Sequence, residues 1–189
     1  MRRGFKAEAE RLAEQCRERC GVEADRPLLP ARTLALALGV RLIEPREITG
    51  IPDMVLETLR ADSSSWSAIT VPAPSGPVVI VNPFHAPARQ ESDLMHELAH
   101  IICGHEPGGI VLIGTSHLPL RVYDQVQEEE AAWLGGCLQL PRFALLRSIA
   151  GGMSSAEIAA HFGASEALVT WRRNHTAADV QVRRARARG

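Results

Sequence analysis

The chain has 189 residues, 46% of them hydrophobic and 23% charged, with a formal net charge of −1. This composition is that of a folded globular protein built as one compact unit, and it excludes disordered and collagen-like chains. No segment approaches the ~18 consecutive apolar residues of a membrane span, and the N-terminus lacks the apolar centre of a signal peptide. We therefore expect a cytoplasmic protein that has no membrane partner and carries its four cysteines as free thiols.

The first part of the chain predicts helices around a small sheet. Apolar residues recur at helical spacing from Phe5 to Cys16, and a short helix at 30–39 precedes an expected strand at 40–45. Two β-branched runs around a Pro/Ser/Gly turn predict a hairpin within 66–83, and the nearby prolines Pro72, Pro74 and Pro77 indicate a strand that is an edge or ends early. Residues 48–65 are weakly patterned, and 106–124 are expected to form a loop with one short strand.

Two further segments predict helices that carry ionisable residues in apolar surroundings. One helix is expected at about 91–104, ended by Gly104, and the other at about 125–139, closed by Pro141. Together with the hairpin they predict an α+β fold. We expect residues 1–141 to form one domain.

His96, Glu97 and His100 form an HExxH motif on the first of these helices. Side chains four residues apart lie on one helical face, so both imidazoles can reach one Zn²⁺ ion while Glu97 lies beside a bound water. Such a zinc ion activates water and polarises a peptide carbonyl, and Glu97 would move the proton to the leaving amine. The structural alternative is that ordinary hydrogen bonds satisfy these three groups.

The zinc interpretation needs a third protein ligand. The pattern HExxHxxGxxH fails, because Glu106 occupies its last position and His105 is out of register. A carboxylate from the second helix is the other solution. We choose Glu128, which shares its helical face with small residues that would let the two helices lie close together, whereas Glu130 shares its face with larger apolar residues. The alternative for Glu128 is a solvated acidic first turn near a helix N-terminus.

The segments "HELAH" and "EEEAAWLGGCLQLP", together with the N-terminal "RGFKAEAERLA", resemble the ImmA/IrrE family of intracellular zinc metallopeptidases. The resemblance covers roughly residues 5–174. It implies a zincin-like core, one Zn²⁺ ion per chain held by His96, His100 and Glu128, and Glu97 as the catalytic base. It also implies a helix-turn-helix repressor as substrate, cleaved in response to a stress such as DNA damage or mobile-element activity. Ala132 stands where relatives commonly have Asn or Asp. The hydrogen bond that the Asn or Asp side chain makes to a ligand is therefore missing here or supplied by another residue.

Other residues near the motif are weaker candidates. Tyr123, His117 and His105 could each stabilise the oxyanion of a tetrahedral intermediate, although a surface or packing role is the simpler interpretation for each. Cys103 lies near the ligand face, where a thiolate could occupy the open zinc position, but a buried small hydrophobic residue is the simpler reading. The hairpin could offer an edge strand to an extended substrate, or it could be a plain structural sheet.

The C-terminal end has a different charge balance. Residues 142–189 carry eight Arg against three acidic residues, a balance of +5 that leaves −6 for residues 1–141. Residues 142–175 predict a helical extension packed on the peptidase domain, with a helix-turn-helix outline around Gly163 and a capping box at Ser154. Arg172 and Arg173 on its second helix are candidate nucleic-acid contacts, and nucleic acid is a candidate signal. Residues 176–189 are expected to form a flexible basic tail.

Two functional hypotheses of different classes follow. The first is a zinc-dependent endopeptidase that cleaves a partner repressor. The second is a DNA-binding or repressor-binding regulator with a vestigial peptidase site. The complete set of ligands and base favours the first hypothesis.

Overall fold

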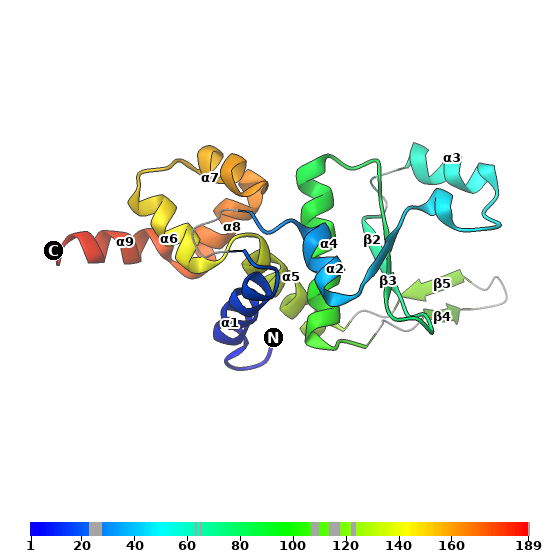
Figure 1. The fold of residues 1–189 in the computed structure, drawn as a ribbon, viewed down its shortest axis with the longest axis horizontal. Helices are drawn as coiled ribbons and strands as arrows, with labels where there is room; N and C mark the ends of the chain where they lie inside the picture. Colours follow the sequence, from blue (N-terminus) through cyan, green and yellow to red (C-terminus); the bar gives the residue numbers. More distant parts are fainter. Residues whose placement is uncertain are drawn as a thin grey trace.

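The computed structural model describes residues 1–22, 28–62, 64, 66–106, 110–113, 118–121 and 124–188. The fold is mixed α+β, as expected from the sequence, with a small sheet on one side of a central helix and most other helices on its opposite side (Figure 1). None of the helices in these ranges is long and apolar enough to cross a membrane.

The N-terminal half contains a three-stranded mixed sheet. Its strands have the order β1-β3-β2, with β1 (Arg41–Ile43) parallel and β2 (Ala68–Val71) antiparallel to the central strand β3 (Val78–Val81). The predicted hairpin is therefore present. Strand β2 is an edge of this sheet and ends at the residue before Pro72. A proline lacks the N–H group that would continue the ladder, which explains the early end of the strand.

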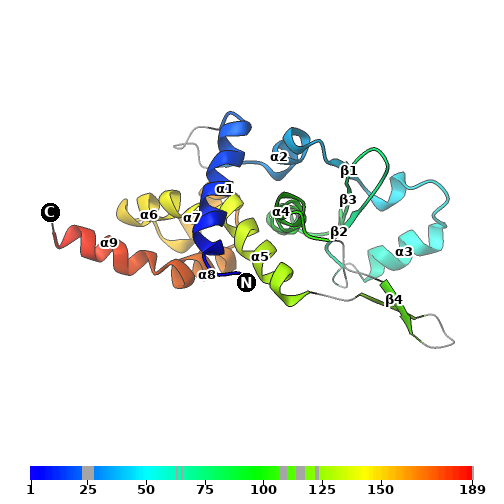
Figure 2. The ribbon, with the colours of Figure 1, turned by 90° about the horizontal axis from the view of Figure 1, so that it is seen from below.

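Helix α4 (Pro87–Cys103) is the central element that joins the sheet to the other helices. One side contacts β2 and β3, and another makes its most extensive contact with α5 (Gln125–Gln139). Figure 2 shows α4 end-on between the strands and α5. Helices α1 (Phe5–Arg19) and α2 (Ala31–Leu38) pack on α5 and α4 respectively. Helix α4 is therefore covered by the sheet on one side and by α5 on another.

The C-terminal region consists of four helices. These are α6 (Arg142–Ala150), α7 (Ser155–Phe162), α8 (Glu166–Thr176) and α9 (Ala178–Arg186). Helices α7 and α8 have the predicted helix-turn-helix outline, with the capping box at Ser154 and a left-handed Gly163 between them. A buried apolar cluster, from Leu140 to Ala178, fills this region separately from the cluster around α4.

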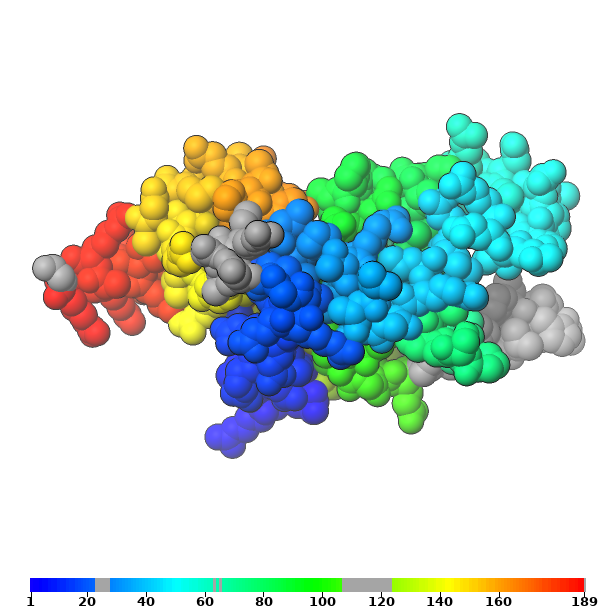
Figure 3. Space-filling view, viewed as in Figure 1, coloured from blue at the N-terminus to red at the C-terminus, as the bar shows by residue number. Residues whose placement is uncertain are grey.

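Three segments differ from the sequence-based expectations. The weakly patterned segment contains α3 (Asp53–Ala61), none of whose residues is buried, so the pattern of a core-facing helix is missing there. The expected loop with one strand contains two strands, β4 (Ile110–Ile113) and β5 (Leu118–Arg121), paired antiparallel. The expected flexible tail forms helix α9, which packs on α6 and buries Ala178 and Val182; it lies at the far end of the molecule from the sheet (Figure 3).

Candidate metal centre

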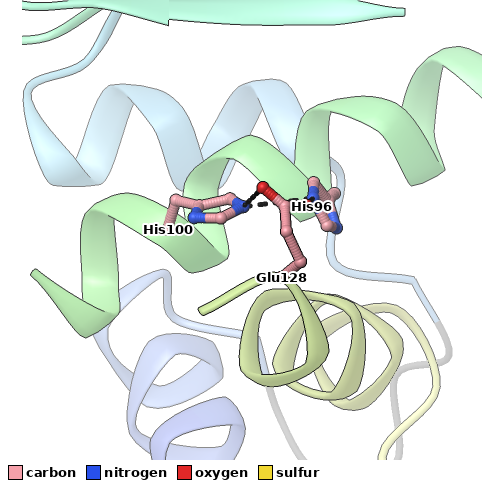
Figure 4. A group of neighbouring side chains, drawn as sticks. All are labelled: His96, His100 and Glu128. Carbon is pink, nitrogen blue, oxygen red and sulfur yellow. Dashed lines mark hydrogen bonds and ion pairs between the residues drawn. The ribbon is translucent and has the colours of Figure 1, made fainter. Parts of the chain in front are cut away.

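Helix α4 positions the two histidines of the HExxH motif. Pro87 stands at its start, where its missing N–H costs nothing, and the apolar face of the helix is buried: Leu94, Met95, Leu98 and Ala99. His96 and His100 are one turn apart and both point towards α5 (Figure 4). The packing of the apolar face therefore fixes the direction of the imidazoles.

Helix α5 supplies the carboxylate. Asp124 caps the helix by accepting hydrogen bonds from the backbone N–H groups of Val126 and Gln127, which places Glu128 in the first turn. A Cβ atom added to Gly135 would lie 3.3 Å from the backbone of His96, so the lack of a side chain there lets the two helices approach closely. This is the close approach that the small residues on this face of α5 predict.

The side chains of His96, His100 and Glu128 converge at one point, and their ligand atoms all lie within 4.8 Å of one another. The Nε2 atoms of the two histidines are 3.1 Å apart, His96 Nε2 is 3.1 Å from Glu128 Oε2, and His100 Nε2 is 3.6 Å from Glu128 Oε1. Zinc bound tetrahedrally at about 2.0–2.1 Å requires neighbouring ligand atoms about 3.3–3.4 Å apart. The three separations therefore fit the edges of a zinc tetrahedron.

These three side chains are partly open to solvent. His96 is 31% exposed, Glu128 34% and His100 17%. A catalytic zinc site keeps its fourth position for water or substrate, whereas a structural site is closed by four protein ligands. Within the described ranges no fourth cysteine, histidine or carboxylate joins the cluster. The arrangement is that of an open site.

Glu97 points away from α5 and towards the sheet. Its side chain is buried, and its Oε2 accepts a hydrogen bond from the hydroxyl of Thr70 on edge strand β2. Glu97 follows His96 directly in the chain, and its contact with Thr70 ties this candidate base to strand β2.

A second group of polar residues lies behind His100. The Nδ1 atom of His100, which faces away from the cluster, is 3.0 Å from Nδ1 of His105, and His105 Nε2 is 3.5 Å from Glu130 Oε2. Glu130 in turn accepts hydrogen bonds from the backbone N–H and the Nε of Arg2. Burial acts to raise the pKa of Glu130, but the hydrogen bonds and charge of Arg2 outweigh it, so the pKa lies below its usual value.

The structure places only some of the weaker candidate residues near the ligand cluster. Tyr123 and His117 lie outside the described residues. Cys103 is half-buried and is not part of the ligand cluster; burial, and then the negative charge of Glu130, raise the pKa of its thiol to about 11. Because its sulfur does not converge with the ligand atoms of His96, His100 and Glu128, Cys103 does not suit the role of a thiolate that blocks the metal. The ring of His105 lies behind His100, which does not suit an oxyanion donor.

The structure corrects the expected nucleic-acid role of Arg172. This side chain has no exposed surface and is bound by Glu10 at 2.6 Å, the carbonyl of Leu140 at 3.0 Å and the sulfur of Cys137 at 3.3 Å. Its guanidinium attaches α8 to α1 and α5 and is inaccessible to a nucleic acid. Arg173 is partly exposed, but it forms a two-pronged ion pair with Asp179.

Sequence reasoning missed Thr70 and the contacts of His105 with Glu130. Thr70 is 27 residues from Glu97, and nothing in the local sequence of β2 indicates that contact. A signal did exist for Glu130, because it is an ionisable residue on the apolar face of α5, where a charged group needs a buried partner.

The fold and the site together define a zincin-like α+β protein with a candidate His–His–Glu metal centre. The model of the IrrE N-terminal-like domain, peptidase family M78, matches residues 46–172, which is about two thirds of the chain. The chain belongs to this family. The match contains α4, α5 and all of the residues that form the candidate centre. No significant match was found among curated proteins or among solved structures.

Proposed function

We propose that this protein is a zinc-dependent endopeptidase that cleaves a partner transcriptional repressor in response to a stress signal. The observation that supports the peptidase proposal best is the set of separations between the ligand atoms of His96, His100 and Glu128, which fit a tetrahedral zinc ion with one open position. The family match supports the same class of activity.

His96, His100 and Glu128 would hold the zinc ion. When bound, zinc supplies a Lewis acid that polarises the scissile carbonyl and lowers the pKa of a water molecule. Glu97 would take the proton from the attacking water and pass it to the leaving amine. The hydrogen bond that Thr70 donates to Oε2 of Glu97 would help to hold the carboxylate in place for this transfer.

The edge strand β2 supports a peptide as the substrate. Among the described strands it hydrogen-bonds only to β3, so its other edge can pair with an extended chain. Because Thr70 on this strand contacts Glu97, a peptide paired along β2 would pass beside the catalytic base. The exposed side chains of Ile69 and Val71 offer apolar contacts to such a peptide.

The proposed substrate is a helix-turn-helix repressor, and the proposed signal is DNA damage or mobile-element activity. Both rest on the resemblance to the ImmA/IrrE family. The family match supports the broader class, a metallopeptidase-like regulator. Zinc binding and repressor cleavage therefore need separate tests.

The first experiment measures the metal content of the purified protein by mass spectrometry, with His96→Ala and Glu128→Ala beside the wild type. We expect about one zinc per wild-type chain and loss of zinc in both variants. Glu129→Gln is the matched control, since this neighbour of Glu128 points to the N-terminal amino group and should keep the zinc. A wild type that binds no zinc would refute the peptidase proposal.

The second experiment mixes zinc-loaded protein with candidate repressors and follows cleavage by mass spectrometry. Wild type should produce two fragments from one of them, and Glu97→Gln should produce none while retaining its zinc. Cleavage by Glu97→Gln at the wild-type rate would exclude Glu97 as the base. Zinc binding without cleavage of any candidate repressor would contradict the proposal of repressor cleavage.

A regulator that binds nucleic acid is the second candidate, and the surface of α6 and α9 favours it. We call this surface, together with Arg188 just after α9, the basic end; its exposed arginines are Arg142, Arg147, Arg183, Arg184, Arg186 and Arg188. Phosphate contacts from such residues would make affinity strongly salt-dependent.

The test replaces Arg147, Arg183 and Arg184 by Ala and measures duplex DNA affinity over a range of salt concentrations. If the basic end binds DNA, the slope of log affinity against log salt should fall by about three, or about one per lost phosphate contact. The matched control replaces three exposed arginines elsewhere: Arg11, Arg41 and Arg60. Equal slopes for the two triple variants would exclude the basic end as a specific site.

A further inference from the structure

We propose that His105 and Glu130 are positioning residues for the metal centre, which fix the ring of His100 so that its Nε2 points at the zinc. We call the three residues the His100–His105–Glu130 relay. The inference rests on the proposed function only in assuming that zinc is the metal. It concerns the residues that hold the ligands in place. The HExxH motif identifies the ligands and the base, but not these residues.

The backbone at the end of α4 brings His105 back to His100. Gly104 has φ 64°, in the left-handed region that glycine adopts without strain, and it ends the helix there. The N–H of His105 then donates to the carbonyl of His100 at 3.0 Å, and the N–H of Gly104 to the carbonyl of Ile101 at 3.1 Å. This is the paired hydrogen-bond pattern of a Schellman motif. It places residue 105 directly beside the turn that carries His100.

The side chains complete the contact. The rings of His100 and His105 are nearly perpendicular, at 72°, and their Nδ1 atoms are 3.0 Å apart. When Nε2 of His100 binds a metal, the proton of this ring must be on Nδ1. Nδ1–H then donates to Nδ1 of His105. The proton of His105 is consequently on Nε2, which lies 3.5 Å from Glu130 Oε2, at ion-pair distance but without a hydrogen bond in this structure.

Glu130 is the fixed end of the relay. Its side chain is 3% exposed and that of His105 7% exposed, so neither group exchanges its protein contacts for water easily. The backbone N–H of Arg2 donates to Glu130 at 2.7 Å and Nε of Arg2 at 3.0 Å, while His105 Nε2 lies 3.5 Å away. Two donors from Arg2 thus hold the carboxylate in the direction of His105. His105 and Glu130 therefore form a second contact between the segment that follows α4 and helix α5, beside the ligand cluster.

The relay supplies His100 with a partner for its second ring nitrogen. Metal-binding histidines almost always donate their second ring N–H to a carboxylate, carbonyl or water, and loss of such a partner typically costs about 10–100-fold in metal affinity. The Nδ1 atom of His105, 3.0 Å from Nδ1 of His100, is the acceptor in this structure. We therefore expect zinc affinity in this protein to depend strongly on His105 and Glu130.

The test compares zinc affinity, measured by competition with a chelator, in wild type, His105→Leu, His105→Asn and Glu130→Gln. We expect about 10–100-fold weaker binding for His105→Leu. His105→Asn should lose less, because the amide oxygen can still accept from Nδ1 of His100. Glu130→Gln should fall between wild type and His105→Leu. The matched controls are Glu129→Gln, beside Glu130 but 47% exposed, and His161→Leu, on the exposed side of α7.

Two further readouts separate positioning from a general effect on folding. One is thermal unfolding of the metal-free proteins, and the other is the visible absorption spectrum of the Co²⁺-substituted proteins, which reports ligand geometry. A relay that orients His100 predicts an altered Co²⁺ spectrum and weaker zinc binding in variants that are folded without metal. Lower metal-free stability with unchanged affinity and spectrum would overturn the proposal. If His105→Leu does not fold, Glu130→Gln and His105→Asn decide the question.

The outcome also distinguishes this inference from the proposed function. A wild type that binds no zinc overturns both. A wild type that binds zinc, with His105→Leu and Glu130→Gln binding equally tightly, overturns the relay alone. Weaker zinc binding in these variants supports the relay, even if no repressor is cleaved by the wild type.

Discussion

The candidate metal centre between α4 and α5 and the contact of α8 with α1 and α5 both gather charged side chains, but in opposite ways. At the metal centre, three ligand atoms converge on one point and stay partly exposed. At the other contact, Arg172 is fully buried and its donors are taken by Glu10, Cys137 and Leu140. Converging groups with an open side can bind a further atom, whereas a saturated buried group stabilises the fold. The two regions should therefore respond differently to substitution.

The largest expected effect is on peptide cleavage, at Glu97, the proposed catalytic base. Glu97→Gln should lower peptide cleavage by about 10²–10⁴-fold, because an amide cannot take the proton from water. Zinc content should stay at the wild-type value, since Glu97 is not among the three converging ligands. A cleavage assay on metal-quantified protein measures both. Loss of zinc in this variant would show instead that Glu97 supports the ligands.

The contact of α8 should show the reverse behaviour. Glu10→Gln leaves the buried charge of Arg172 without its anion, and breaking a buried ion pair in this way costs about 3 kcal/mol or more of unfolding free energy. Denaturant unfolding measures the loss, with Glu14→Gln on the exposed face of α1 as the control. Zinc bound per folded chain should not change. A stable variant that has lost its zinc would mean that the two regions are not independent.

Two adjacent glycines of α5 allow a sharper comparison. An added Cβ at Gly135 would meet the backbone of His96 on α4, whereas one at Gly136 would meet side chains of α8, the nearest being Trp171 at 3.1 Å. Gly135→Ala should weaken zinc binding, because the backbone of α4 cannot move aside without shifting His96; overpacking costs about 1–3 kcal/mol. Gly136→Ala should leave zinc affinity unchanged and affect only stability. Equal zinc affinities in both variants would contradict the importance of the close helix approach.

The convergence of His96, His100 and Glu128 could be predicted from the sequence because its determinants are local. Spacing on a helix decides that His96 and His100 share a face, and small residues on α5 indicated which face of that helix approaches. Helix α5 was predicted at its observed bounds, since Asp124 caps it and Pro141 follows its end. The partners of these residues were harder to predict. Thr70 reaches Glu97 across 27 residues, and such a contact depends on how the sheet packs on α4.

The C-terminal region shows the limit of local patterns. The capping box at Ser154 and the turn at Gly163 predicted α7 and α8, and both helices are present. The same pattern gave no means to distinguish an arginine on the exposed face from one buried against another helix. Arg172 is buried because Glu10, 162 residues away, lies opposite it. Helix α9 was missed because its sequence is mostly charged, and only Ala178 and Val182 are buried.

The smallest effect is expected at Arg173, the exposed neighbour of Arg172. Its hydrogen bond lowers the pKa of Asp179 below the ordinary 3.8, so the pair stabilises the fold above that pH and the stabilisation is lost as the pH falls through the lower, folded-state value. Asp179→Asn should cost less than about 1 kcal/mol at neutral pH, because Asp179 is 41% exposed and solvent screens the pair. The difference in unfolding free energy between variant and wild type should shrink in high salt and towards acidic pH. A difference that stayed constant from neutral pH to well below 3.8 would mean that Asp179 acts through packing and not through its charge. Such a result would give Arg173 a structural role, like that of Arg172. The basic end would then remain the surface to test for nucleic-acid binding.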